Sequence, residues 1–314
     1  MIKMNILITG GSGFIAGRLA KHFSLKFKKV LLVTRKKNLK LDLPDNVQIK
    51  NIDWDNQLNL ENLCDNIDII FHTAGMNAKD CEKDPKKADI FNGYKTLKLI
   101  KSAIKKNVKK FIFLSSAHVY SNPLIGIINE DTKVTNAHPY ATSNILAENF
   151  IIQSISDSKI NGYIFRLSNV FGAPINIGSD CWHLAIQDIC YQAIKNKKII
   201  LNSNGSQKRD FLPMESLSNF FEKIINNKIN FDQNIINLGA GQSQTILEMA
   251  SFIQLRTKLN YGFIPKIITN ENDTKINKHN FIFTSNFNHI SSLELETNKY
   301  KEVDELLNFC KKNF

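Results

Sequence analysis

A run of small residues near the start of the chain is of a type that binds phosphate. Thr9-Gly10-Gly11-Ser12-Gly13-Phe14-Ile15-Ala16-Gly17 follows an apolar segment and leads into an amphipathic one. A pyrophosphate can reach a helix N-terminus only where the turn is tight and no side chain blocks the backbone. Gly10, Gly13 and Ala16 meet this need at G-x-x-G-x-x-A spacing, and Gly11, Gly13 and Ala16 at G-x-G-x-x-A spacing. The turn therefore predicts a dinucleotide site.

The residue at the end of the second predicted strand bears on which dinucleotide binds. An NAD site commonly has an acidic residue there, which binds the ribose 2′-hydroxyl. Arg35 occupies this place instead, followed by Lys36 and Lys37. These cations would complement a 2′-phosphate, so the sequence favours NADP over NAD. The alternative interpretation is that Arg35 faces solvent or stacks on adenine.

Apolar strands alternate with amphipathic helices through the first half of the chain. Short strands that are apolar throughout and separated by helices are typical of a parallel sheet covered on both faces. The expected fold class is therefore α/β, with a Rossmann-type doubly wound parallel sheet. The predicted strands are residues 5–9, 30–34, 47–52, 67–72, 111–115 and 161–167, and the predicted helices are residues 14–27, 88–106 and 141–154.

The regular alternation ends after Phe171, where Gly, Pro, Asn and Ser gather around residues 172–179. Helices and short strands then mix, which indicates a smaller C-terminal substrate-binding lobe. One further apolar strand, residues 234–238, could return to the main sheet, and residues 291–314 have the pattern of a closing helix. We expect a dinucleotide-binding domain of residues 1–170, rejoined by about 208–240, and a substrate-binding lobe of residues 171–207 and 241–314.

Composition argues against several other classes of protein. The chain has 314 residues, of which 43% are hydrophobic and 22% charged, which is typical of a globular protein with a sizeable core. Its apolar runs are too short to span a membrane and its start does not resemble a secretory signal, so we expect a cytoplasmic protein. The five cysteines are scattered without C-x-x-C spacing, which argues against disulfides and against a metal site.

The net charge of +12 could suit a polyanionic partner. The lysines lie in short groups at predicted helix ends and in turns, without interleaved aromatic residues. A solvated, lysine-rich surface explains this distribution better than nucleic-acid binding, so we expect no nucleic-acid partner.

Two further motifs form a constellation with the glycine turn. Ser115-Ser116-Ala117-His118-Val119-Tyr120 ends an apolar strand, and Pro139-Tyr140-Ala141-Thr142-Ser143-Asn144 begins a helix, with Tyr140 24 residues beyond Ser116. Together these motifs resemble, over nearly the whole chain, the extended short-chain dehydrogenase/reductase superfamily, in its NAD(P)-dependent nucleotide-sugar epimerase and dehydratase group. The resemblance implies a nicotinamide cofactor, a nucleotide-sugar substrate and a homodimer.

The resemblance makes Tyr140 the acid/base of a ketone/alcohol interconversion and Ser116 its partner on the same oxygen. A free tyrosine has a pKa of about 10, so it acts as a base near neutral pH only if that pKa falls by several units. The family uses a lysine four residues further on, where this chain has Asn144. An asparagine amide can still bind the ribose hydroxyls, but it brings no charge. Three interpretations remain: an active enzyme that relies on the positive nicotinamide ring, a slow or specialised enzyme, or a non-catalytic nucleotide-binding protein.

Other residues also match positions with roles in the superfamily. Arg209-Asp210-Phe211 resembles the motif whose arginine binds the nucleotide diphosphate, and Asn169 resembles an asparagine that contacts substrate. We expect His118 to line the substrate as well. The residues expected to hold or support the cofactor are Gly10, Gly13, Phe14, Ile15 and Arg35, then Asp53 at the adenine, Ala74 and Gly75 in the loop beside the cofactor, and Asn92 on a supporting helix.

The reaction itself is less sharply indicated. Dehydratases of this group have an Asp-Glu pair just after the catalytic hydroxyl residue, and Ala117-His118 stands there instead, which disfavours dehydration. The Ser-Ala-x-Val-Tyr string resembles epimerases, whereas Arg35 would suit a 4-keto reductase that consumes NADPH. We place the epimerase slightly ahead of the reductase. A non-catalytic binding protein is the remaining alternative.

Overall fold

The centre of the molecule is a seven-stranded sheet in which every neighbouring pair of strands is parallel. The computed structural model describes residues 2–157, 160–270, 280–287 and 295–314. The strand order is β11-β7-β5-β4-β1-β2-β3. The second and third strands of the chain lie on one side of β1, and the later strands begin with β4 on its other side, as in a doubly wound fold. The strands are β1 (Ile2–Thr9), β2 (Phe27–Thr34), β3 (Val47–Asn51), β4 (Ile69–His72), β5 (Lys110–Ser116), β7 (Asn161–Leu167) and β11 (Ile235–Leu238).

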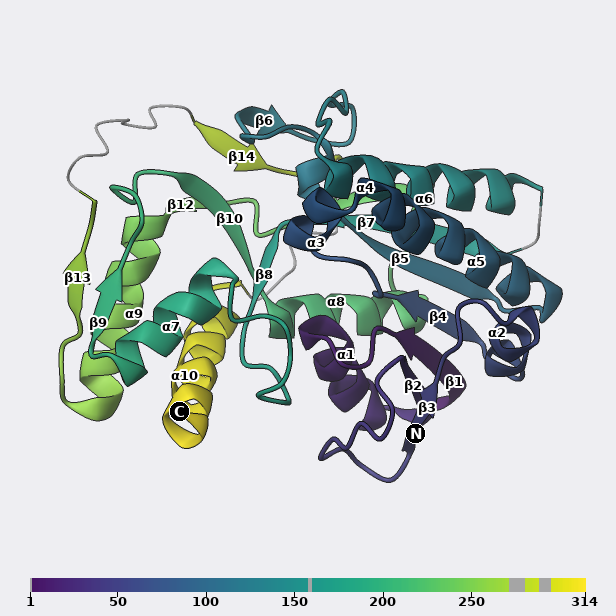
Figure 1. Ribbon diagram of the computed structural model, residues 1–314, viewed down its shortest axis with the longest axis horizontal. Helices are drawn as coiled ribbons and strands as arrows, with labels where there is room; N and C mark the ends of the chain where they lie inside the picture. Colours follow the sequence, from purple (N-terminus) through teal and green to yellow (C-terminus); the bar gives the residue numbers. More distant parts are fainter. Residues whose placement is uncertain (1, 158–159, 271–279, 288–294) are drawn as a thin grey trace.

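Helices cover both faces of this sheet (Figure 1). Side chains alternate along β1, so Ile6 and Ile8 pack into one core and Leu7 into the other. The first core includes residues of α1 (Phe14–Ser24) and α8 (Met214–Ile225), and the second includes residues of α2 (Gln57–Cys64), α5 (Lys95–Lys105) and α6 (Pro139–Ser156). The predicted Rossmann-type α/β fold is therefore confirmed.

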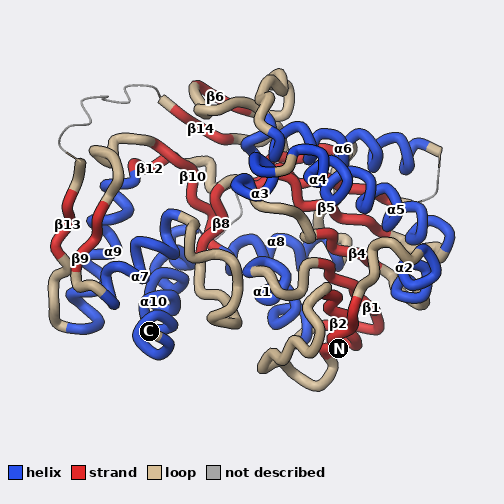
Figure 2. Tube along the Cα trace, in the orientation of Figure 1, coloured by secondary structure: helices blue, strands red, loops and turns tan. Residues whose placement is uncertain are grey.

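A second group of elements lies beside the sheet, on the left of Figures 1 and 2. Its helices pack around a separate apolar core. Its elements are the strands β8 (Asn169–Phe171), β10 (Lys208–Pro213) and β12 (Ser243–Thr245), the pair β9 (Lys198–Ile200) and β13 (Lys266–Ile268), and the helices α7 (Ala185–Lys195), α9 (Ile246–Tyr261) and α10 (Leu295–Asn313). Strand β11 does return to the main sheet beside β7. The exact division into a dinucleotide domain and a substrate lobe stays a prediction.

Several element boundaries differ from those that the sequence predicts. Helix α1 ends at Ser24 rather than at residue 27, because Phe27 already begins β2. The predicted helix 88–106 is interrupted: α4 (Pro85–Ala88) leads into a π-helical turn, η1 (Asp89–Tyr94), before α5 begins. The closing helix α10 begins at Leu295, and the earlier part of the predicted range lies outside the described residues.

Four smaller elements complete the described chain: α3 (Ala78–Lys83) follows β4, the 3-10 turn η2 (Ala117–Val119) follows β5, and β6 (Gly126–Ile128) pairs with β14 (Phe281–Phe283). All five cysteines are buried and free. Within the described residues we find neither a helix that could cross a membrane nor a cluster of metal-ligating side chains.

Candidate active site

The glycine turn leaves the N-terminus of helix α1 open. Gly10 has a φ of +78°, and a Cβ there would lie 2.9 Å from Thr73 Oγ1, so a residue with a side chain would be both strained and crowded. Gly13 is the N-cap residue of α1 and provides no side-chain cap. The first N–H groups of the helix can therefore bind an anion, and the turn fits the pyrophosphate of a dinucleotide.

Hydrogen bonds fix the loop after β4 beside this turn. The Thr9 hydroxyl accepts from the backbone N–H groups of Thr73 and Ala74, both at 3.1 Å, and Thr73 Oγ1 donates to the Thr9 carbonyl at 2.7 Å. His72 lies between the hydroxyls of Thr9 and Thr96, at 2.8 and 2.7 Å. Burial lowers the pKa of His72 to about 3, so its ring is neutral and serves this polar contact.

A cavity of about 650 Å³ extends from the glycine turn along the edge of the sheet. Parallel strands bring their carboxyl ends together at this edge, which is why motifs far apart in the chain meet here. Eight of the site residues predicted from the sequence line the cavity: Gly10, Gly13, Arg35, Ala74, Gly75, Asn92, Tyr140 and Asn144.

The remaining predicted cofactor residues lie beside this cavity. Phe14 and Ile15 line the neighbouring cavity, described below. Asp53 lines another cavity, of about 850 Å³, and Arg35 lines both this cavity and the one along the glycine turn. The Arg35 guanidinium lies 4.4 Å from the centre of the Phe91 ring, so it stacks on an aromatic side chain of the protein. Cofactor contacts of Phe14, Ile15 and Asp53 stay predictions.

Asn92 links the loop after β4 to a neighbouring helix through its side chain. Its side chain is buried in the π-helical turn η1, a type of turn frequent at functional sites. The amide oxygen accepts from the backbone N–H of Met76 at 2.8 Å, and the amide nitrogen donates to Ser143 Oγ at 2.9 Å. Asn92 thereby joins the loop beside the cavity to helix α6.

Tyr140 and Ser116 meet where two cavities join. Ser116 ends β5, and Tyr140 lies in the first turn of α6, which begins at Pro139 with His138 as the side-chain cap. Tyr140 lines both the 650 Å³ cavity and a second cavity of about 640 Å³, which Ser116 also lines. The structure thus brings the predicted acid/base and its partner together.

The surroundings of Tyr140 do not lower the pKa of its phenol, as a general base near neutral pH would need. Burial raises its pKa above the usual value, and hydrogen bonding to Ser116 opposes this rise. Among the described residues, the remaining influence is Cys81, which raises the pKa further, so no cation acts on the phenol. Asn144 is buried, and its amide donates to the Tyr140 carbonyl at 2.7 Å. A neutral amide therefore occupies the position where the resemblance implies a lysine.

A buried ion pair holds helix α6 against the sheet behind this site. Glu148 accepts from the Arg166 guanidinium at 3.1 and 2.6 Å and from Ser115 Oγ at 2.5 Å. Glu148 lies two helical turns beyond Tyr140, and Ser115 directly precedes Ser116. The network thus fixes the two halves of the Ser116–Tyr140 pair relative to each other.

The second cavity is lined by the three predicted substrate residues, His118, Asn169 and Arg209. Asn169 and Arg209 lie on the adjacent strands β8 and β10, and the Asn169 amide donates to the Asp210 carbonyl at 2.9 Å. Burial lowers the pKa of His118 to about 4, with Arg209 and His138 adding to the effect, so His118 is neutral at pH 7.

Arg209 is a half-buried cation without a carboxylate partner among the described residues. Its Nη2 donates to the amide oxygen of Gln207 at 3.1 Å, and partial burial lowers its pKa. Such a guanidinium is free to form charge-assisted hydrogen bonds with a phosphate in the cavity.

Several residues that line the two cavities were not predicted from the sequence. Trp54, Phe91, Asn77 and Asp180 line the first cavity, and Gln187 lines the second. Asn77 also caps α3, which is the ordinary role for an asparagine before a helix. Asp180 comes from the loop after β8, where its side chain accepts from Asn77 at 3.0 Å, and the sequence contains no pattern that places this loop over the glycine turn.

The doubly wound sheet, the open turn at α1 and the paired cavities define a dinucleotide-binding protein of the Rossmann type. The sequence model of the NAD dependent epimerase/dehydratase family matches residues 6–239. The chain belongs to this family.

Known relatives agree with this assignment. UDP-glucose 4-epimerase of Dictyostelium discoideum is 26% identical over 280 residues, which cover 81% of this chain and 81% of that protein. The dTDP-D-glucose 4,6-dehydratase of the same organism is 26% identical over 278 residues, which cover 79% of this chain and 61% of that protein. The structure of UDP-N-acetylglucosamine 4-epimerase from Methanobrevibacter ruminantium M1, in complex with UDP-N-acetylmuramic acid, superposes with a TM-score of 0.80 at 22% identity and covers 100% of both chains.

These findings confirm the predicted superfamily, an enzyme class and a nicotinamide dinucleotide, since the family is NAD-dependent. They do not favour the reductase or the non-catalytic binding protein. The preference for NADP over NAD stays a prediction.

Proposed function

We propose that the protein is an NAD-dependent 4-epimerase of a nucleotide sugar. The observation that supports this most is the meeting of two cavities at Tyr140, one along the glycine turn and one with Arg209 in its wall. The names of the relatives, a UDP-glucose 4-epimerase and a UDP-N-acetylglucosamine 4-epimerase, support a UDP-hexose as the substrate class.

The first cavity would hold the cofactor. The backbone N–H groups beyond Gly13 would bind the pyrophosphate, and Ala74 and Gly75 would contact the dinucleotide from the loop after β4. When bound, the oxidised nicotinamide would supply a hydride acceptor and a positive charge. The NAD dependence of the family places NAD first, and Arg35 keeps NADP as the alternative to test.

Tyr140 and Ser116 would act on the sugar hydroxyl. Tyr140 would take the hydroxyl proton while the sugar is oxidised, and Ser116 would hydrogen-bond the same oxygen. Tyr140 would give the proton back when the ketone is reduced again. The raised pKa of Tyr140 makes its deprotonated form scarce at neutral pH in the unliganded protein. We therefore expect the turnover rate to rise with pH.

The second cavity would hold the nucleotide sugar. Arg209 would pair with the diphosphate, and Asn169 and His118 would bind the substrate through neutral hydrogen bonds. From the superfamily resemblance we further propose a homodimer. From the sequence pattern we propose a cytoplasmic location and a substrate lobe formed by residues 171–207 and 241–314.

The test is to denature purified protein, identify any released nicotinamide by mass spectrometry, and then add UDP-hexoses to native protein while recording absorbance at 340 nm. The proposal predicts released NAD(H) and a transient absorbance with formation of the 4-epimer. Stoichiometric oxidation of NADPH by a keto sugar would instead indicate a reductase. Failure to bind any nicotinamide would contradict the proposal.

A further inference from the structure

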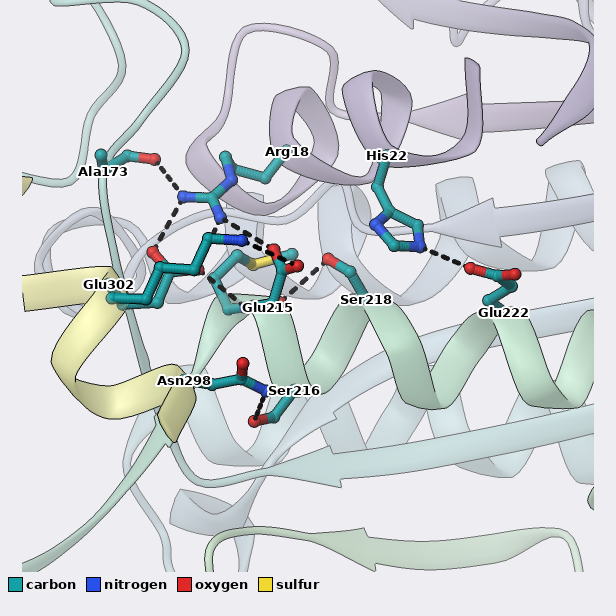
Figure 3. Close-up of polar contacts among 11 residues, drawn as sticks. Arg18, His22, Ala173, Glu215, Ser216, Ser218, Glu222, Asn298 and Glu302 are labelled. Atoms are coloured by element: carbon teal, nitrogen blue, oxygen red, sulfur yellow. Dashed lines mark hydrogen bonds and ion pairs between the residues drawn. The ribbon is translucent and has the colours of Figure 1, made fainter. Parts of the chain in front are cut away.

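A buried ion pair joins α1, the helix that follows the glycine turn, to the C-terminal helix α10 (Figure 3). Arg18 lies on α1, one helical turn beyond the glycine turn. Its Nη1 and Nη2 donate to the two carboxylate oxygens of Glu302 on α10, at 2.9 and 2.5 Å. The Glu302 side chain is fully buried and that of Arg18 is 12% exposed. This is the two-pronged guanidinium–carboxylate geometry that fixes orientation as well as distance.

The same two side chains contact the segments that follow β8 and β10. Arg18 Nη1 donates to the Ala173 carbonyl at 2.9 Å, two residues beyond the end of β8. Glu302 Oε1 accepts from the backbone N–H of Glu215 at 2.8 Å, in the first turn of α8, which directly follows β10. Pro213, the N-cap residue of α8, provides no side-chain cap, so Glu302 supplies that cap from another helix.

Gly172 is the residue that makes room for this carboxylate. It has a φ of +147°, and a Cβ there would lie 2.1 Å from Glu302 Oε2. The chain that follows β8 therefore approaches the ion pair more closely than any residue with a side chain would permit.

These contacts connect the two proposed ligand sites. Helix α1 begins at the glycine turn, β8 contains Asn169, and β10 contains Arg209. The Arg18–Glu302 pair joins α1 to α10 and contacts the segment directly after β8 and the first turn of α8, which follows β10. A shift of the glycine turn would therefore act on both strands that bear the proposed substrate residues.

We propose that Arg18 and Glu302 are positioning residues that couple cofactor binding to nucleotide binding. With the cofactor on the glycine turn, α1 is held in place, and the ion pair then holds β8 and β10 in the geometry that binds a uridine diphosphate. Because coupling between two ligands is reciprocal, bound UDP should increase the affinity for the cofactor by the same factor by which bound cofactor increases the affinity for UDP. The inference rests on the proposed function for the identity of both ligands.

The experiment measures the Kd of NAD⁺ with and without saturating UDP, for the wild-type protein and three variants. In the wild type, we expect UDP to lower the Kd of NAD⁺ by a factor of at least about five, which is within the usual range of such couplings. Glu302→Gln and Arg18→Lys should reduce this factor to near one. Arg18→Lys keeps a cation for Glu302 but loses the planar fork, so it serves even if Glu302→Gln fails to fold.

Asp304→Asn is the matched control. Asp304 also lies on α10 and also pairs with an arginine, Arg256 of α9, but both partners belong to the second group of elements. It should lower thermal stability and leave the coupling factor unchanged.

Two results would overturn the inference. One is a wild type that binds both ligands without coupling, and the other is a full coupling factor in folded Arg18→Lys or Glu302→Gln, which would make the pair merely structural. A wild type that binds neither NAD⁺ nor UDP would instead contradict the proposed function, and the inference with it.

Discussion

At the scale of single residues, the neutral side chain of Asn144 bears on how the proposed acid/base, Tyr140, would work. Its amide donates to the backbone of its own helix, and among the described residues no cation contributes to the raised pKa of the Tyr140 phenol. Burial without compensating charge disfavours the phenolate, so the acid/base is well suited to donate a proton and poorly suited to accept one near pH 7. Proton acceptance should then depend on pH and on the charge of the bound cofactor.

Asn144→Lys should move the rising limb of the pH–rate profile to lower pH by about one unit or more and raise the rate at pH 7. A lysine at this position faces the cofactor cavity and adds a positive charge that stabilises the phenolate. Asn144→Met is the control, because it adds similar length without charge and should leave the profile in place. An unchanged profile in Asn144→Lys would show that charge here does not limit the reaction.

Tyr140→Phe should lower turnover by at least about 100-fold, because it removes the proposed proton acceptor and donor. The Kd of the cofactor should stay within about twofold, since the glycine turn is unaffected. Steady-state kinetics and a binding titration check both parts. Turnover that stays near the wild-type rate would refute the assignment of Tyr140.

Arg35→Asp should weaken the binding of NADP relative to that of NAD by about tenfold or more, if the guanidinium that stacks on Phe91 binds the 2′-phosphate. Lys40→Asp gives the same charge change at an exposed residue outside the cavity lining. Binding titrations with both dinucleotides provide the comparison. An unaltered preference in Arg35→Asp would refute this role.

At the scale of elements, the sequence predicted best where local pattern and long-range pairing agree. Strand β7 (Asn161–Leu167) has the predicted boundaries because its apolar run is bounded by polar residues. The π-helical turn was not predictable, because residues 88–106 keep helical periodicity. The turn instead goes with hydrogen bonds of the Asn92 side chain to Met76 and Ser143, which lie far from it in the sequence. Helix α8 was missed although Leu217, Phe220 and Phe221 recur at helical spacing.

Gly172→Ala should lower the free energy of unfolding by about 1–3 kcal/mol. Two costs add, because the backbone has a positive φ and the new Cβ would crowd the Glu302 carboxylate. Gly126→Ala is the matched control, since Gly126 also has a positive φ, +80°, but has open space where a Cβ would be. Denaturant unfolding gives both values. Equal losses in the two variants would contradict the close contact with Glu302.

At the scale of the whole molecule, the carboxyl edge of the sheet explains why so much of the site was predictable. Gly10 and Ala74 follow strands of the same parallel sheet and Ser116 ends another, so the topology alone brings them together. The loop after β8 and the packing of α10 depend instead on contacts more than 100 residues apart, such as Arg18 with Glu302. Single-residue patterns do not encode such contacts.

The most direct test of the central claim follows the hydrogen at carbon 4 of the sugar. The protein is incubated in ordinary water with UDP-glucose deuterated at carbon 4, and in parallel with the same label in UDP-N-acetylglucosamine, and the products are examined by NMR and mass spectrometry. The account predicts a 4-epimer that retains the deuterium, because the same hydride leaves and returns. A 4-epimer that has lost its deuterium to solvent, or no epimer from either sugar with NAD⁺ bound, would contradict it.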